Sequence, residues 1–287
     1  MNITKTIKID INSDEYPRLL KEIPDPPKHL YLRGNTELLN TASVSVVGSR
    51  NATDYGKWSA EKLGELMAMN CVTVISGMAQ GIDSYAHRTV LNGGGKTIAV
   101  LGNGVDICYP KTNVSLYKEI LKKGLVISEY EDGQMPKKYS FPLRNRIISG
   151  LSLVTVIVEA GLKSGSLITA ERAGDQGRCV YAIPGNLNRN TSFGCNKLIS
   201  EGANIMISFD DVLRELDIKI NCSEKEYKDI SEIEKKIIGT LREQGEMTVN
   251  DICVKTKMSA SQITGIVTVL EMKGYVQTAY GKIFIEK

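Results

Sequence analysis

From residue 43 to residue 216, the spacing of hydrophobic residues switches repeatedly between a pattern typical of strands and one typical of helices. Short runs of apolar and β-branched residues, such as 44–48 and 153–158, predict strands that are buried on both faces. Segments with helical spacing, such as 55–69 and 82–91, separate these runs. Strands that alternate with helices are typical of βαβ units with right-handed crossovers. The pattern therefore predicts an α/β fold, an extended Rossmann-like, doubly wound and mainly parallel sheet.

The two ends of the chain break this alternation. Residues 1–40 form a short lead-in with a proline-rich connector, and the sheet domain covers 41–217. Residues 218–230 are polar and charged, which indicates a linker. In 231–287 the pattern predicts three helices and a hairpin, with Ser231 as an N-cap and Glu234 completing a capping box. We expect a small winged-helix domain there.

Composition excludes several classes of protein. The six cysteines are scattered without a Cys-x-x-Cys pair and there are two histidines, which argues against disulfides and against a metal site. No apolar run approaches the roughly 20 residues of a membrane helix, and the first residues lack the apolar core of a signal peptide. No phosphate-binding P-loop and no nucleophile–base pair is visible. We expect a cytoplasmic protein without membrane contact, metal, cofactor or catalytic residues.

Positive charge is concentrated in one part of the chain. Residues 133–197 contain nine Lys or Arg and three acids, a net charge of +6, so the remainder of the +3 chain nets −3. Such a concentration is the electrostatic signature of a polyanion-binding surface.

Small glycine-rich loops follow the predicted strands and meet at one edge of the sheet. Four of them are 48–53, 76–83, 102–106 and 184–186, and open α/β sheets bind ligands at that edge. A fifth, 163–166, directly precedes a helix, where free N–H groups and the helix dipole favour a phosphate. Arg50 and Arg144 are both expected in turns at this edge.

Eight motifs in this order resemble the DNA-processing protein A (DprA/Smf) family. They include Val-Gly-Ser-Arg (47–50), Ser-Gly-Met-Ala-Gln-Gly-Ile-Asp (76–83), Phe-Pro-Leu-Arg-Asn-Arg-Ile-Ile-Ser-Gly-Leu (141–151) and Ser-Gly-Ser-Leu-Ile-Thr-Ala (164–170). The resemblance covers roughly residues 16–216. It implies a dimer that binds single-stranded DNA, protects incoming DNA in natural transformation and helps to load RecA recombinase. The lead-in is short for this family.

The resemblance also implies the positions of the DNA contacts. It places phosphate contacts at Ser49, Arg50, Lys138, Arg144, Arg146 and the Ser164–Ser166 turn, and Phe141 near a base. The expected nucleic-acid-binding set is Gly48, Ser49, Arg50, Lys138, Phe141, Arg144, Asn145, Arg146, Lys163, Ser164, Gly165 and Ser166.

Two alternatives stay open from the residues. A nucleotide-processing enzyme of the phosphoribohydrolase kind would use Glu159, which ends the central strand and otherwise caps a helix or braces a loop. A winged-helix regulator would read duplex DNA with the helix at 259–273, which carries one base, Lys273, and one acid, Glu271. That charge is poor for neutralising phosphates.

Overall fold

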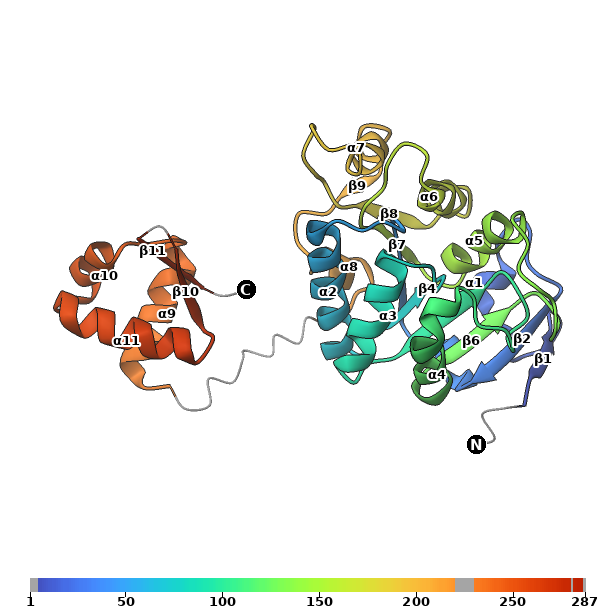
Figure 1. The fold of residues 1–287 in the computed structure, drawn as a ribbon, viewed down its shortest axis with the longest axis horizontal. Helices are drawn as coiled ribbons and strands as arrows, with labels where there is room; N and C mark the ends of the chain where they lie inside the picture. The colour runs from blue at the N-terminus through green and yellow to red at the C-terminus, as the bar shows by residue number, and fades with distance from the viewer. Residues whose placement is uncertain (1–4, 220–229, 280, 286–287) are drawn as a thin grey trace. The chain divides into compact units, whose positions relative to one another are not determined.

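Nine strands form one sheet in the first part of the chain, in the order β1-β2-β6-β5-β4-β3-β7-β8-β9 (Figure 1). The strands from β3 to β9 pair in parallel, whereas β2 runs antiparallel to both β1 and β6. The strands are β1 (Ile7–Asp10), β2 (His29–Gly34), β3 (Ser43–Val47), β4 (Thr73–Ser76), β5 (Thr97–Leu101), β6 (Leu125–Ser128), β7 (Val154–Ile157), β8 (Cys179–Ala182) and β9 (Asn204–Ile205).

The computed structural model describes residues 5–219, 230–279 and 281–285, and contacts group the chain into two units, 1–221 and 222–287. Each helix of these ranges is too short or too polar to cross a bilayer. The predicted linker, 218–230, falls largely outside the described residues.

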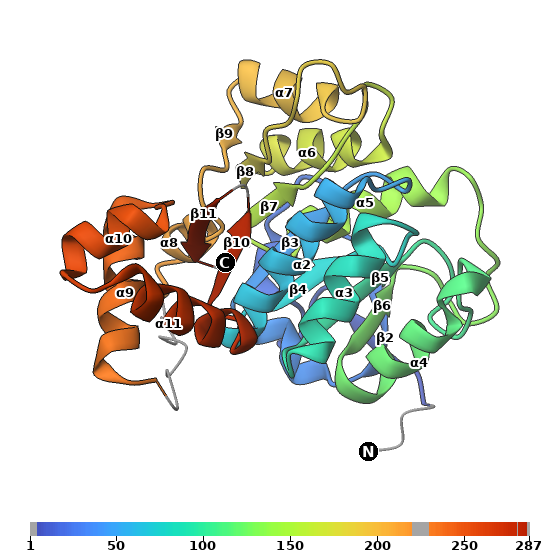
Figure 2. The same ribbon diagram turned by 60° about the vertical axis from the view of Figure 1, so that its left-hand side comes forward.

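Helices cover both faces of the sheet, which confirms the predicted doubly wound α/β fold (Figure 2). Helices α2, α3, α4 and α8 bury their apolar side chains in one core, and α1, α5, α6 and α7 contribute to the core on the opposite face. The helices are α1 (Arg18–Lys21), α2 (Asp54–Met69), α3 (Ile82–Asn92), α4 (Val114–Lys123), α5 (Ser140–Gly150), α6 (Gly165–Asp175), α7 (Phe193–Ser200) and α8 (Asp211–Glu215), with short 3-10 helices η1 (Thr36–Asn40) and η2 (Lys111–Asn113).

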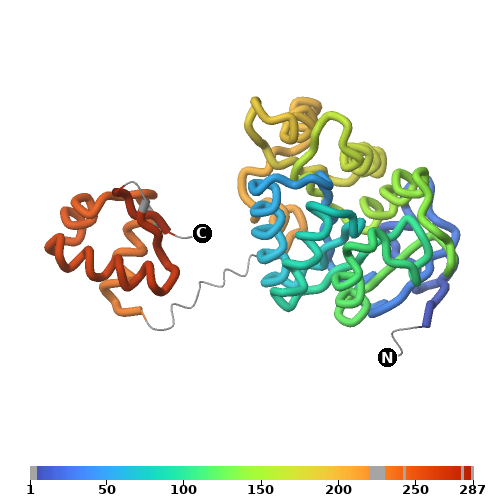
Figure 3. Tube along the Cα trace, viewed as in Figure 1, coloured from blue at the N-terminus to red at the C-terminus, as the bar shows by residue number. Residues whose placement is uncertain are grey.

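The first 40 residues are part of this fold, contrary to their treatment as a separate lead-in. Strands β1 and β2 extend the sheet beside β6, and Figure 3 shows these blue segments next to the green chain of β6 and α5. Leu20, Ile23 and Leu30 are buried in the same core as Ile147 of α5. The proline-rich connector of the predicted lead-in joins α1 to β2.

The direction of the chain across the sheet reverses at β3. After β3 the chain adds β4, β5 and β6 on one side, and α5 then carries it back to β7 on the other side of β3. The loops that leave β3 and β7 therefore diverge. In open α/β sheets a crevice opens at the strands' carboxyl ends at such a switch point.

The second unit has the predicted elements of a winged helix: α9 (Glu232–Gln244), α10 (Val249–Thr256), α11 (Ala260–Met272), β10 (Val276–Ala279) and β11 (Lys282–Ile285). The capping box of Ser231 and Glu234 is present as predicted. Capping boxes at Thr248 and Ser259 begin the other two helices. The predicted turn includes Tyr280, which lies outside the described residues.

Leu20→Ala is expected to lower the free energy of unfolding by about 2–5 kcal/mol, because it removes a fully buried side chain of α1 from the sheet's core. Leu187→Ala is the matched control, since Leu187 is 91% exposed, and we expect a change within about 0.5 kcal/mol. Urea denaturation of the two variants provides the measurement. Equal stability would mean that the side chain of Leu20 does not contribute to the core.

Candidate nucleic-acid interface

A cleft of about 850 Å³ opens at the switch point between β3 and β7. Its walls are the loop after β3, the loop after β7 with the first turn of α6, and the amino-terminal half of α5. All but one of the residues predicted to bind nucleic acid line this cleft: Gly48, Ser49, Arg50, Lys138, Phe141, Arg144, Asn145, Lys163, Ser164, Gly165 and Ser166. The structure thus brings together segments that are far apart in the sequence.

The loop after β3 is held in place by its backbone. Ser49 donates its N–H to the carbonyl of Glu159 at 2.7 Å, and its own carbonyl accepts from Ile82 at 3.1 Å. Gly81 has a φ of +78°, and a Cβ there would lie 2.2 Å from the Ser49 carbonyl oxygen. Only glycine permits this close approach. Arg50 is consequently fixed by its main chain while its side chain stays exposed.

An aromatic pair lies in the cleft. Tyr109 and Phe141 stack with ring centroids 5.4 Å apart and planes inclined by 27°. The guanidinium of Arg50 lies 6.0 Å from the Phe141 ring. Phe141 is half-buried, whereas Tyr109 is 45% exposed. Sequence reasoning missed Tyr109; the signal was an aromatic residue in the loop after the glycine-rich end of β5.

The first turn of α6 forms another wall of the cleft. The hydroxyl of Ser164 accepts the N–H of Ser166 at 3.4 Å and lies 2.7 Å from the Ser166 hydroxyl. Lys163 directly precedes this turn and is exposed. A helix amino terminus beside a cation is a favourable place for an anion.

Arg144 is buried, which corrects the prediction that it lies in a turn. Helix α5 begins at Ser140, so Arg144 shares its core-facing side with Ile147, Ile148 and Leu151. Its guanidinium donates to the carbonyls of Gly77, at 2.9 Å, and of Val100. We therefore expect Arg144→Ala to damage the fold, instead of leaving it intact.

Charge is nevertheless retained at the floor of the cleft. Burial lowers the pKa of Arg144 to about 10, and the nearby carboxylate of Asp83 partly counters this shift, so the guanidinium is still charged at neutral pH. Asp83 accepts from the N–H groups of Gly77 and Ala79 at 3.2 and 3.3 Å. Burial raises the pKa of Asp83.

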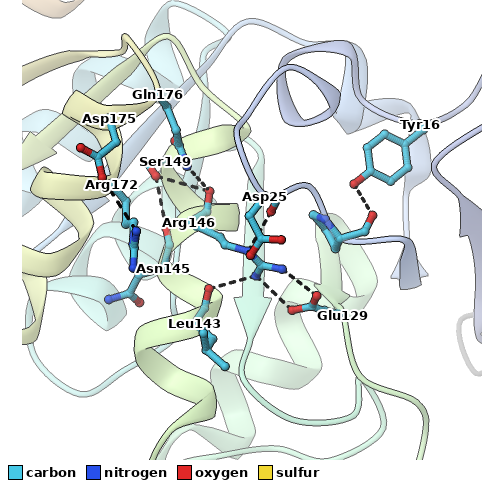
Figure 4. A network of polar contacts seen from close by, with 11 residues as sticks. Tyr16, Asp25, Glu129, Leu143, Asn145, Arg146, Ser149, Arg172, Asp175 and Gln176 are labelled. Atoms are coloured by element: carbon cyan, nitrogen blue, oxygen red, sulfur yellow. Dashed lines mark hydrogen bonds and ion pairs between the residues drawn. The ribbon is translucent and has the colours of Figure 1, made fainter.

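Arg146 is the predicted contact that does not line the cleft. Its guanidinium donates to both carboxylate oxygens of Glu129, at 2.7 and 3.0 Å, and to the carboxylate and carbonyl of Asp25, at 3.0 and 2.9 Å (Figure 4). These contacts join α5 to the end of β6 and to the proline-rich connector. The structure thus gives Arg146 a role inside the fold, because its donors are committed to two acids.

Besides the buried Arg144, three cations line the cleft, and their side chains are accessible to a ligand. Arg50, Lys138 and Lys163 are exposed, and none of them forms an ion pair with a residue that the structure describes. With Arg144 they make four cations among the lining residues, against one acid, Asp83. The cleft is therefore electropositive.

Glu159 braces the start of a helix, which is one of the two roles that the sequence left open for it; the other was catalysis. It is 3% exposed, and its carboxylate accepts the N–H and the hydroxyl of Thr53 at 2.9 and 2.8 Å. Thr53 is the N-cap of α2, so Glu159 fixes the start of that helix. Within the described ranges, no three metal-ligating side chains come together.

Comparison with known proteins identifies two segments. The profile of the DNA recombination-mediator protein A family matches residues 8–217, and a winged helix-turn-helix DNA-binding profile matches 230–277. The chain is 47% identical to DNA processing protein DprA of Streptococcus pneumoniae over 207 residues, which cover 72% of this chain and 73% of that protein. It is 41% identical over 206 residues to protein Smf of Synechocystis, covering 70% of this chain but 52% of that protein.

Solved structures that share the fold include those of two relatives. The X-ray structure of the Streptococcus pneumoniae protein matches with a TM-score of 0.71 and 46% identity, over 74% of this chain and 75% of that one. DNA processing protein A of Helicobacter pylori, described for its single-stranded DNA binding mode, matches with a TM-score of 0.68 and 33% identity, over 75% of this chain and 98% of that one.

Arg146→Ala is expected to reduce the free energy of unfolding by about 2–4 kcal/mol, since it leaves Glu129 without its bidentate partner. Arg50→Ala removes an exposed cation that forms no ion pair with a described residue and should change stability by less than about 0.5 kcal/mol. The measurement is chemical denaturation of both variants. If Arg146→Ala is as stable as the parent, the network in Figure 4 does not support the fold.

Proposed function

Because the chain belongs to the DNA recombination-mediator protein A family, we propose that it binds single-stranded DNA, protects incoming strands in natural transformation and helps to load RecA recombinase onto them. The observation that carries the proposal is the switch-point cleft, where Arg50, Lys138 and Lys163 are exposed without acidic partners among the described residues. Cations without acidic partners can exchange their counterions for phosphates, which is the main source of sequence-independent affinity.

The aromatic pair favours a single strand over a duplex. Tyr109 and Phe141 lie among the cations of the same cleft. Bases of a single strand can stack on such rings, whereas the bases of a duplex are already stacked on each other. The described binding of single-stranded DNA by the Helicobacter pylori relative supports the same choice.

The proposal includes no catalysis. Glu159 is the residue that a nucleotide-processing enzyme would use. Its carboxylate accepts two hydrogen bonds from Thr53 and fixes the start of α2. A carboxylate held in this way is a poor candidate for a proton-transfer group. Release of base or ribose 5-phosphate from a nucleoside monophosphate, abolished by Glu159→Gln, would contradict this part of the proposal.

We assign the winged helix a minor part in DNA affinity. Helix α11, the candidate recognition helix, contains no Lys or Arg, and the adjacent Lys273 is paired with Glu234 at 2.8 Å. Reading a duplex depends on cations along such a helix. We further propose that the protein acts in the cytoplasm as a homodimer, which would present two clefts to one strand and raise the affinity through effective concentration.

The full-length protein is expected to bind a single-stranded oligonucleotide in preference to a duplex of the same length. The affinity should fall with salt, by roughly 0.7 in the log-log slope for each phosphate contact. Arg50→Ala should weaken binding about tenfold to a hundredfold, because it removes one charged hydrogen bond.

The control is Arg18→Ala, which removes an exposed cation of α1 that is paired with Glu22 and does not line the cleft. Fluorescence anisotropy at two salt concentrations gives the affinities. Equal affinity for duplex and single strand, or no response to salt, would refute the proposal.

A truncated chain of residues 1–217 is expected to keep most of the single-strand affinity and to remain a dimer, because the cleft lies within the first unit. Residues 225–287 carry ten Lys or Arg and nine acids, so they can release few counterions. Light scattering and anisotropy on the two lengths provide the test. A monomeric truncation, or a loss above about tenfold, would assign part of the function to the winged helix.

A further inference from the structure

A second cavity, of about 520 Å³, adjoins the cleft. It is formed by the first turn of α2, by Glu159 and by the loop that follows β8. Thr191 lines both cavities, and its neighbour Asn190 lines the cleft. A chain-like ligand that lies in the cleft can therefore pass over Thr191 into the second cavity.

A pair of stacked, exposed aromatic rings extends outward from the lining of this cavity. Tyr55, which lines it, and Trp58, one turn further along α2, are 47% and 44% exposed. Their rings are stacked, with centroids 6.1 Å apart and planes inclined by 22°. The Tyr55 hydroxyl donates to the carbonyl of Pro184 at 3.0 Å, and Trp58 packs edge-on against Phe209 at 5.8 Å. Both rings are thus held in position while they expose surface, as in a platform on which a base stacks.

The loop between the two cavities supplies a cation. Arg189 is exposed, lines the second cavity and forms no ion pair with any residue in the described ranges. The two acids of the cavity are already engaged: Asp54 is paired with Lys57 at 2.8 Å, and Glu159 is bonded to Thr53. Glu159 is only 3% exposed, so among the described residues that line this cavity the exposed charge without an ion-pair partner is the guanidinium of Arg189.

We propose that Arg189, Tyr55 and Trp58 form a second subsite for single-stranded DNA. A strand that leaves the cleft over Thr191 places a phosphate against Arg189 and a base on the Tyr55–Trp58 platform. The inference rests on the proposed function and extends it, because it gives the bound strand a direction of exit from the cleft. It also predicts that affinity increases when an oligonucleotide becomes long enough to reach α2.

Trp58 is the single tryptophan of the chain, so its emission reports on this subsite directly. Unlabelled oligothymidylates of increasing length are titrated into the full-length protein, and binding is measured in parallel by competition against a labelled strand. The shortest oligonucleotides that bind should occupy the cleft and leave the emission unchanged. Longer ones should quench it, with a simultaneous gain in affinity.

Two variants separate the subsite from the cleft. Trp58→Leu should lower the affinity for long oligonucleotides about fivefold to a hundredfold, which is the range for loss of one stacked base. It should leave the affinity for the shortest oligonucleotides unchanged. Arg189→Ala keeps the fluorophore and should abolish the length-dependent quenching. Arg18→Ala, which removes an exposed cation of α1 that is paired with Glu22 and lines neither cavity, is the control and should behave as the parent. Circular dichroism establishes that each variant is folded.

Three results would overturn the inference. The first is binding of long strands with unchanged Trp58 emission, and the second is quenching that persists in Arg189→Ala. The third is an emission that changes with protein concentration in the absence of DNA, because this would show that another protein surface covers the platform. In the first two cases the proposed function still stands. Failure of oligonucleotides of every length to compete would instead refute the proposed function.

Discussion

The cleft depends on one buried charge, the guanidinium of Arg144. It bonds to the carbonyls of Gly77, after β4, and Val100, in β5, and to the side chain of Asn145 at 3.3 Å. Asn145 in turn donates to the carbonyl of Gly165 at the start of α6. Burying an ion costs several kcal/mol unless it is fully hydrogen-bonded, so these groups are held where the guanidinium needs them. The same charge that fixes the floor of the cleft also adds to its positive potential.

The structure separates its arginines and lysines into two groups with different roles. Arg144 and Arg146 are buried and committed to carbonyls and carboxylates, so they shape the site. Arg50, Lys138 and Lys163 are exposed and form no ion pairs with described residues. Both groups belong to the same predicted nucleic-acid-binding set, where charge alone does not distinguish them. The distinction follows from the phase of α5, which turns Arg144 toward the sheet with Ile147 and Ile148.

Predictions from the sequence succeeded where a local rule determines the structure. The strand predicted at 153–158 contains β7 (Val154–Ile157), and the capping box at Ser231 begins α9. They failed where tertiary context decides. Strand β1 is four residues long with two of them exposed, so its pattern is weak, and it exists because it pairs with β2. Arg144 was predicted in a turn, where a guanidinium would serve a phosphate better than the core. Its burial depends on carbonyl partners that are distant in the sequence.

The arrangement of the cleft also limits how tightly one chain can hold DNA. Three exposed cations, each contributing roughly 0.7 to the salt slope, give a slope of about 2 for one cleft, which is small for a nucleic-acid-binding protein. The amino terminus of α6 and the aromatic pair add contacts that depend little on salt. A single cleft should therefore release DNA readily. Firm retention would then require several clefts on one strand, so that affinity is controlled through assembly and not through any one contact.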